Sequence, residues 1–333
     1  MGGDNAPDAV IKGALNALHN NTNLDIILVG KSKIIKDKLN TYNKNNIERI
    51  AIMDAPEVID MGEKPLKALR KKKKSSIYIG SKLVKEKKAD AFISAGSTGA
   101  VMASGLLNIG RIKEIKRPSI ATIFPSSSGK TLVMDAGANV DSKPVNLQQF
   151  AVMGQIYANK MFNIENPRVG LLNIGEEEKK GNKLTTEAYQ LLKKDNRLEN
   201  FIGNIEGRDI FNGTCDVVIC DGFIGNVVLK TTEGIASYLL HLFKNAFKEN
   251  IITKIAGLMV KPYLKKIKEK VDYRQYGGAP LLGVNGVVII SHGSSDDFAI
   301  ENAISVAIDT DEKNIVKIIK EKKKTNREGE ANG

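Results

Sequence analysis

The chain has 333 residues, of which 42% are hydrophobic and 26% are charged. This composition is typical of a folded globular protein and excludes wholesale disorder, and no apolar run reaches the about 18 residues that a membrane-spanning helix needs. The net charge of +12 suits an acidic protein, an anionic membrane or nucleic acid, but aromatic residues make up only 5% and tryptophan is absent, so nucleic acid is the least favoured partner. Lysine enrichment through biased codon use explains the charge equally well.

Short apolar runs alternate with helix-length segments along most of the chain. Amphipathic segments such as Leu147 to Phe162 and Leu184 to Lys194 separate runs that are typical of buried strands. These runs are residues 25–30, 48–55, 89–96, 131–137, 168–175, 215–222 and 287–293. Continuous apolar strands with helices between them predict an α/β fold, a three-layer α/β/α arrangement around a mostly parallel sheet.

Residues 119–135, "SIATIFPSSSGKTLVMD", predict a hairpin within that sheet, because two apolar runs flank a short polar turn. The Gly-Lys-Thr at 129–131 resembles the end of a phosphate-binding P-loop. However, the first glycine of that motif would fall at Phe124, and the segment enters a strand where a P-loop opens a helix. The sequence also lacks the G-x-G-x-x-G motif of dinucleotide-binding proteins.

Five predicted strands end in glycine with a small polar or acidic residue close behind, at Gly96, Gly137, Gly175, Gly222 and Gly293. Ligands of open parallel sheets bind at the carboxyl ends of the strands. We therefore expect these loops to line one edge of the sheet and to share a cleft. The alternative is that glycine only punctuates the turns.

We predict one large α/β domain over residues 1–320, with a helical projection at 235–272 and a charged, flexible tail at 321–333. Pro262 is expected to break the projection into two helices. Its apolar stripe lies beside several lysines, so it would face a partner subunit or an anionic membrane, or else the protein core.

Candidate metal ligands and nucleophiles are few. His19, His241 and His292 are scattered, and Cys215 and Cys220 have no second pair, so we expect no metal site. Two cysteines in one apolar segment exclude a disulfide framework and indicate a reducing cytosol. Cys220 could act as a nucleophile at a strand end, although a buried small residue is the better interpretation.

What remains is a set of loops rich in glycine, amides and hydroxyls, several of them at the start of a helix, where anions bind well. Each candidate could equally be a helix cap or a turn residue. Taken together they predict a phosphate site. They are Gly3, Asp4, Asn5, Lys64, Ser97, Thr98, Gly99, Asp135, Asn139, Lys180, Asp221, Asn226, His292 and Ser294.

Seven segments carry a family resemblance: "MGGDNAP", "DAPEVIDMGEKPLKALRKKKKSS", "SAGSTGAVMA", "DAGANVD", "EEEKKGNKLT", "CDGFIGNVVLK" and "YGGAPLLGVNGVVIISHGSS". Together they resemble the bacterial phosphate acyltransferases of phospholipid synthesis over nearly the whole chain. The resemblance implies a fold similar to isocitrate and isopropylmalate dehydrogenases and to phosphotransacetylases. It also implies transfer of a fatty acyl group from acyl carrier protein to inorganic phosphate, which gives acyl phosphate for glycerol-3-phosphate acyltransferase. A cytosolic homodimer that associates peripherally with the membrane, and that needs no cofactor, is implied as well.

The sequence departs from the family pattern at two places. Relatives usually carry a short strand before "MGGD", whereas Met1 here begins inside that motif, so we expect either a misassigned start or a missing first strand. Relatives also usually have glutamate where this chain has Val145. A structural role for that position is the better interpretation, because the helix continues normally.

The predicted chemistry needs placement more than acid or base catalysis, since phosphate is already anionic and a thiol leaves readily. We interpret Ser97 and Thr98 as holding phosphate, and Asn139 and Asn226 as orienting phosphate or the thioester carbonyl. Lys180 would neutralise charge. His292 could assist proton movement.

The lysine runs Lys71–Lys74 and Lys265–Lys266 would steer an acidic carrier protein, unless they are simply solvated faces.

Three other functions remain open. One is a coenzyme A-dependent phosphotransacylase on a similar fold. Another is a metal- and nicotinamide-dependent dehydrogenase, which the lack of clustered aspartates disfavours. The last is a non-catalytic adaptor at a membrane surface or on nucleic acid.

Overall fold

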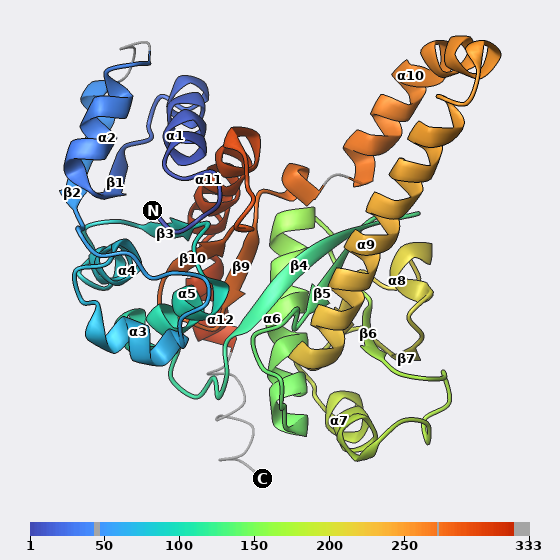
Figure 1. Cartoon of the computed structure of the whole chain (residues 1–333). Coiled ribbons are helices and arrows are strands. Elements are labelled where there is room, and N and C mark those ends of the chain that lie inside the picture. The colour runs from blue at the N-terminus through green and yellow to red at the C-terminus, as the bar shows by residue number, and fades with distance from the viewer. Residues whose placement is uncertain (43–46, 272, 323–333) are drawn as a thin grey trace.

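The computed structural model describes residues 1–42, 47–271 and 273–322, in which helices and strands alternate (Figure 1). The strands are β1 Ile26–Gly30, β2 Ile50–Asp54, β3 Ala91–Ser94, β4 Ser119–Ser126, β5 Gly129–Met134, β6 Val169–Leu172, β7 Phe201–Ile205, β8 Val217–Ile219, β9 Ala279–Leu282 and β10 Val287–Ile290. The α-helices are α1 Asp8–Asn20, α2 Ser32–Leu39, α3 Pro65–Lys71, α4 Ser76–Lys85, α5 Thr98–Ser104, α6 Pro144–Phe162, α7 Lys183–Lys193, α8 Asp209–Asn212, α9 Gly222–Ala246, α10 Ile251–Val271, α11 Asp297–Glu312 and α12 Ile315–Lys322.

The main sheet is mixed but mostly parallel. Among the described residues it has eight strands in the order β3-β10-β9-β4-β5-β8-β6-β7, while β1 and β2 form a separate parallel pair. The pairs β3–β10, β5–β8, β8–β6 and β6–β7 are parallel. The three pairs in the middle, β10–β9, β9–β4 and β4–β5, are antiparallel. The predicted fold class is therefore confirmed, with its hairpin in the centre of the sheet.

Alternate residues of the strands bury their side chains against helices on opposite faces, which produces the three layers. In β10, Val288 packs in the core formed by α3, α4 and α5, whereas Val287 and Ile289 pack against α11. In β5, Leu132 faces the core under α6, and Val133 faces the core beside α8. β5 and β10 are thus apolar on both sides, as strands covered on two faces require.

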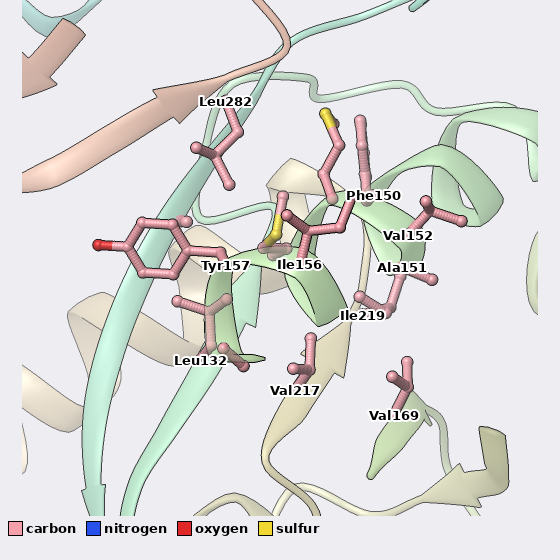
Figure 2. Close-up of a cluster of buried hydrophobic side chains, with 14 of the residues drawn as sticks. Leu132, Phe150, Ala151, Val152, Ile156, Tyr157, Val169, Val217, Ile219 and Leu282 are labelled. Carbon is pink, nitrogen blue, oxygen red and sulfur yellow. The ribbon is translucent and has the colours of Figure 1, made fainter. Parts of the chain in front are cut away.

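The largest core lies between α6 and strands β5, β6 and β8 (Figure 2). Phe150 and Tyr157 of α6 are fully buried there and lie over Leu132, Val169 and Val217. Tyr157 alone removes on the order of 200 Å² of surface from water, so its burial contributes substantially to the stability of this half of the sheet.

The sequence did not predict strands β7 and β9. β7 contains Gly203, at φ +97°, and the polar Asn204, while β9 is only four residues long and contains Pro280. Glycine, asparagine and proline all weaken a strand signature. The predicted hairpin is correct: Ser126 pairs with Gly129, and Gly129 itself has φ +119°.

The helical projection is formed by α9 and α10, which extend away from the sheet (Figure 1). The prediction that Pro262 ends a helix is wrong, because α10 runs through it from Ile251 to Val271. The chain instead reverses before Asn250, whose Oδ1 accepts from Thr253 N at 2.9 Å and whose N–H donates to Thr253 Oγ1 at 3.0 Å. This reciprocal cap begins α10. Of the predicted tail, residues 323–333 lie outside the described residues.

Candidate active site

The loops after β3 and β10 meet the start of the chain, and we call residues 2–5, 61–65, 94–99 and 291–295 the β3–β10 cluster. Asp4 N donates to Gly293 O at 2.8 Å, and Asn5 Nδ2 donates to Ser294 O at 3.0 Å. A Cβ on Gly3 would lie 2.9 Å from Ala95 O. The N-terminal loop therefore fits between the two strand ends only because glycine leaves the room.

The start of α5 is part of the same cluster. Ser97 is buried and Thr98 is exposed, and a Cβ on Gly99 would lie 2.6 Å from Pro65 Cγ, so the first turn of α5 touches the first turn of α3. Lys64 directly precedes α3 and is exposed. His292 is also exposed, with Nδ1 2.7 Å from Ser294 Oγ. Hydroxyls, amide groups and one ammonium thus gather at this rim.

A second group of predicted residues surrounds the ends of β5 and β8, and we call residues 135–139 and 220–226 the β5–β8 cluster. The Asp135 carboxylate is fully buried and accepts four N–H groups: Ile120 N at 3.1 Å, Ala138 N at 2.9 Å, Asn139 N at 2.8 Å and Asn139 Nδ2 at 2.7 Å. Burial raises the pKa of Asp135, and these four donors oppose that shift. With its lone pairs used in this way, Asp135 holds the loop in shape.

The start of α9 packs directly on that loop. Asp221 caps the helix by accepting from Ile224 N at 2.9 Å, and Gly222 N donates to Asn139 O at 2.8 Å. A Cβ on Gly225 would lie only 1.8 Å from Asp135 O. The glycines of "DGFIGN" thus allow helix and loop to touch through their backbones, which leaves Asn226 exposed at the contact, with its side chain 3.5 Å from the place of a Cβ on Gly137.

The two clusters are joined through one hydrophobic core. Ala136 belongs to the same buried group as Ala100 and Val101 of α5, and Ala138 packs against that group. The loop that carries Asn139 and the helix that begins at Thr98 therefore share one buried core. Fourteen predicted residues thus fall into two adjoining clusters and one separate loop.

That separate loop follows β6 and carries Lys180, which is exposed. Asn173 Nδ2 donates to Lys180 O at 3.0 Å, and Asn204 Nδ2 donates to Glu177 O at 2.9 Å. Asn173 and Asn204 lie at the ends of β6 and β7 and hold the loop from beneath. Sequence reasoning did not select either residue as functional, and for Asn204 it could not, because β7 itself was not predicted.

The expectation that all five glycine-ended strands open on one edge of the sheet is wrong. β3 and β10 run in one direction, and β5, β8 and β6 run in the other, because β9 and β4 reverse the direction between them. The loops are linked instead through the buried core that α5 shares with Ala136 and Ala138.

The cysteines are poor nucleophiles. Cys215 and Cys220 are buried, and burial raises the pKa of Cys215 to about 12 and that of Cys220 well above its ordinary value. In the described ranges, no three His, Cys, Asp or Glu side chains gather closely enough to hold a metal ion. None of the helices formed by the described residues has the length and apolar character needed to cross a membrane.

Solved structures share this fold. A phosphotransacetylase from Streptococcus pyogenes superimposes with a TM-score of 0.62 over 92% of both chains at 18% identity. A branched-chain phosphotransacylase from Enterococcus faecalis V583 gives 0.56 at 13% identity, over 92% of this chain and 96% of that one. At these identities the likeness establishes the architecture, which is that of the phosphotransacylases.

Sequence comparison identifies the family. Residues 1–318 match the family model described as fatty acid synthesis protein. The phosphate acyltransferase of Halothermothrix orenii is 62% identical over 330 residues, which cover 99% of this chain and 98% of that one. The phosphate acyltransferase of Dictyoglomus turgidum is 52% identical over 308 residues, 92% and 91% of the two chains. The chain belongs to the phosphate acyltransferase family of fatty acid and phospholipid synthesis, and it is an acyltransferase.

Proposed function

We propose that this enzyme transfers a fatty acyl group from the thioester of acyl carrier protein to inorganic phosphate and releases acyl phosphate. The observation that carries the proposal is the junction of the two clusters: the loop bearing Asn139 shares a buried core with the helix that starts at Thr98, and Asn226 of α9 lies against that loop at Gly137. Relatives named phosphate acyltransferase, at up to 62% identity, support the same reaction.

The reaction balances without an added base. An oxygen of HPO₄²⁻ attacks the thioester carbonyl carbon, the C–O bond forms, and the C–S bond then breaks. The hydrogen of the phosphate ends on the thiol, so acyl phosphate and free thiol account for every atom. Because a thiol has a pKa of about 8.5, it leaves without strong acid catalysis. The protein has to hold phosphate near the carbonyl and donate hydrogen bonds to the oxyanion.

The predicted residues divide between these tasks. The ammonium of Lys180 neutralises charge, Asn226 donates to phosphate or to the oxyanion, and Ser97 and Thr98 bind phosphate with nearby amides. His292 relays the proton to the thiol. A further group shapes the rim of the two clusters and its frame: Gly3, Asp4, Asn5, Lys64, Gly99, Asp135, Asn139, Asp221 and Ser294.

Trapping with hydroxylamine tests the reaction, because acyl phosphate yields a hydroxamate. The concentration of the thioester donor is kept the same in every assay. We expect hydroxamate above the background that the thioester itself gives with hydroxylamine only when phosphate and enzyme are both present. A second function, transfer from a coenzyme A thioester, is supported by the architecture shared with phosphotransacetylases. The kcat/KM values of the two donors decide between them. Absence of a phosphate-dependent product from either donor would refute the catalytic proposal and leave the adaptor.

We also propose that the α9–α10 projection forms a homodimer and touches the membrane. Beyond the first turn of α9, no residue of that helix is buried, and Tyr238 and Phe243 are 62% and 50% exposed. At the start of α10, Ile251 and Ile252 are more than 70% exposed, and Lys254 is close by in the sequence. An apolar helix face of this size is normally covered.

Separate variants distinguish these two contacts. We expect Phe243→Glu to convert a dimer into a monomer in light scattering. Ile252→Glu should leave the dimer intact and reduce flotation with anionic vesicles. A wild-type monomer would rule out the dimer, and unchanged flotation of Ile252→Glu would rule out membrane contact at the tip. The proposed location is thus cytosolic and peripheral to the membrane.

A further inference from the structure

The segment from Lys64 to Lys74 forms a strongly cationic surface at the rim of the β3–β10 cluster. Its sequence, "KPLKALRKKKK", contains seven basic residues and no acidic residue. Lys67, Arg70 and Lys71 of α3 are exposed, and within the described part of the chain they take part in no ion pair. Lys72 alone is neutralised, by Glu63 at 2.6 Å. This surface keeps its charge available for a partner.

The same surface has exposed apolar side chains between its charges. Leu66 on α3 is 53% exposed, and Met61 just before it is 47% exposed. Interfaces with an acidic protein combine such apolar contacts with a ring of complementary charge. Phosphate alone would need neither the apolar residues nor a surface of this length.

This surface lies directly beside the β3–β10 cluster. Pro65, the first residue of α3, touches Gly99 at the start of α5, and a Cβ on Gly293 would lie 2.6 Å from Met61 Cε. A protein seated on α3 would therefore present its thioester at the rim that carries Thr98 and His292.

Other cationic segments do not combine these features. In the loop at 111–116, Arg111 is held by the carbonyl of Lys116 at 2.6 Å. The pair Lys265–Lys266, of which only Lys265 has a described side chain, lies on α10, on the opposite side of the molecule from α3 (Figure 1).

We propose that α3, through Lys67, Arg70 and Lys71 around Leu66, is the docking surface for the acidic carrier protein that delivers the acyl thioester. This inference rests on the proposed function, since it assigns a place to the donor of that reaction. Docking at α3 orients the donor so that its thioester reaches the adjoining rim at Thr98 and His292.

Charge reversal on α3 tests the proposal against a matched control on α2. The test variant is Lys67→Glu/Arg70→Glu/Lys71→Glu. The control is Lys31→Glu/Lys33→Glu/Lys36→Glu, which makes the same change in net charge on exposed residues next to and within α2. Steady-state kinetics are measured with acyl carrier protein thioester and with a coenzyme A thioester at two salt concentrations, and folding is checked by circular dichroism.

We expect the α3 variant to raise KM for the carrier-protein thioester by on the order of tenfold or more and to leave kcat within about twofold, because surface charges mainly govern encounter. The control should shift KM far less. Salt should raise KM of the wild type and the control, and should have little effect on the α3 variant. Any activity with the coenzyme A thioester should be unchanged.

Equal KM values for the α3 variant and the wild type, or equal shifts in the α3 and α2 variants, would overturn docking at α3 while leaving the reaction intact. A wild-type enzyme that forms no acyl phosphate from any donor refutes the proposed function instead. If the triple variant does not fold, Lys67→Gln and Arg70→Gln, each alone, provide the same comparison on a smaller scale.

Discussion

The loops after β5 and β6 carry predicted site residues but are built in opposite ways. The loop at 135–139 is organised around a buried carboxylate that accepts four N–H groups, and helix α9 lies directly against its backbone. The loop at 173–182 is exposed from Glu176 to Asn182. It is held by the side-chain amides of Asn173 and Asn204 beneath it and, at Glu178, by Gln190 Nε2 and Lys193 Nζ. We infer that the loop at 135–139 is rigid. The loop at 173–182, which carries Lys180, depends on a few side-chain hydrogen bonds that a substitution can remove.

Substitutions should therefore damage stability at the first loop and turnover at the second. Gly225→Ala should have the largest effect on folding, because its Cβ would lie 1.8 Å from Asp135 O and the helix would have to move. We expect a loss of about 3 kcal/mol or more in the free energy of unfolding, measured by urea denaturation.

Gly234→Ala in the same helix is the matched control. Nothing lies within 4 Å of its added Cβ, so helix propensity should leave stability equal or higher by up to about 1 kcal/mol. If Gly225→Ala were as stable as Gly234→Ala, the close packing of α9 on the loop would not exist in solution.

Lys180→Ala should have the largest effect on turnover. Loss of a charge that stabilises the transition state typically reduces kcat by on the order of 100-fold, equivalent to about 3 kcal/mol. Because the Lys180 side chain is exposed, the melting temperature should not change. Lys179→Ala, one residue earlier and also exposed, is expected to keep near-normal activity in the hydroxamate assay. Equal losses in both variants would reduce Lys180 to a contributor to general surface charge.

Asn204→Leu should affect turnover less than Lys180→Ala does. Leucine has nearly the same shape, so the change removes chiefly the hydrogen bond from Asn204 Nδ2 to Glu177 O. The loop that carries Lys180 should then sample more conformations, and we expect kcat to fall by about tenfold at unchanged KM for the carrier-protein thioester.

Asn200→Leu, just before β7, provides the comparison, because the Asn200 side chain donates to Asn166 O at 3.3 Å and so holds a different segment of the chain. If the two variants had the same kcat, or if Asn204→Leu lost activity only by unfolding, Asn204 would have no positioning role.

The same contrast explains what sequence could and could not predict. Glycine-ended apolar runs identify β3, β5, β6, β8 and β10, because period and turn chemistry are local properties. The reversal of the sheet is not local, since it depends on β9, whose Pro280 weakens the strand signature.

Within the site, the sequence marks Asp135 as a candidate because it is polar and close to a glycine. It does not indicate that Asp135 holds the loop in shape. That role depends on Ile120 and Asn139 approaching it from two directions, which only the folded chain determines. Likewise, the apolar α9–α10 segment is visible in the sequence, whereas Pro262 misleads, because the turn is set by the cap at Asn250.

The smallest expected effect concerns thiol labelling. The rate at which a reagent labels Cys220 in the native protein reports how rigid the loop at 135–139 is. Cys220 Sγ lies 3.6 Å from Asp135 O, beneath the rigid loop, so a reagent reaches it only when α9 lifts from residues 135–139. With a pKa of about 12, Cys215 is ionised to only about one part in 10⁴ at pH 8, and burial raises the pKa of Cys220 as well. We expect dithionitrobenzoate at pH 8 to label neither thiol of the native protein within an hour and both after denaturation, with Cys215→Ser used to assign any slow phase to Cys220. Gly225→Ala should speed up that phase, because the clash props the helix away from the loop. Rapid labelling of Cys220 in the wild type would contradict a rigid loop at 135–139. That loop would then be as mobile as the loop at 173–182, and the contrast between the two would be lost.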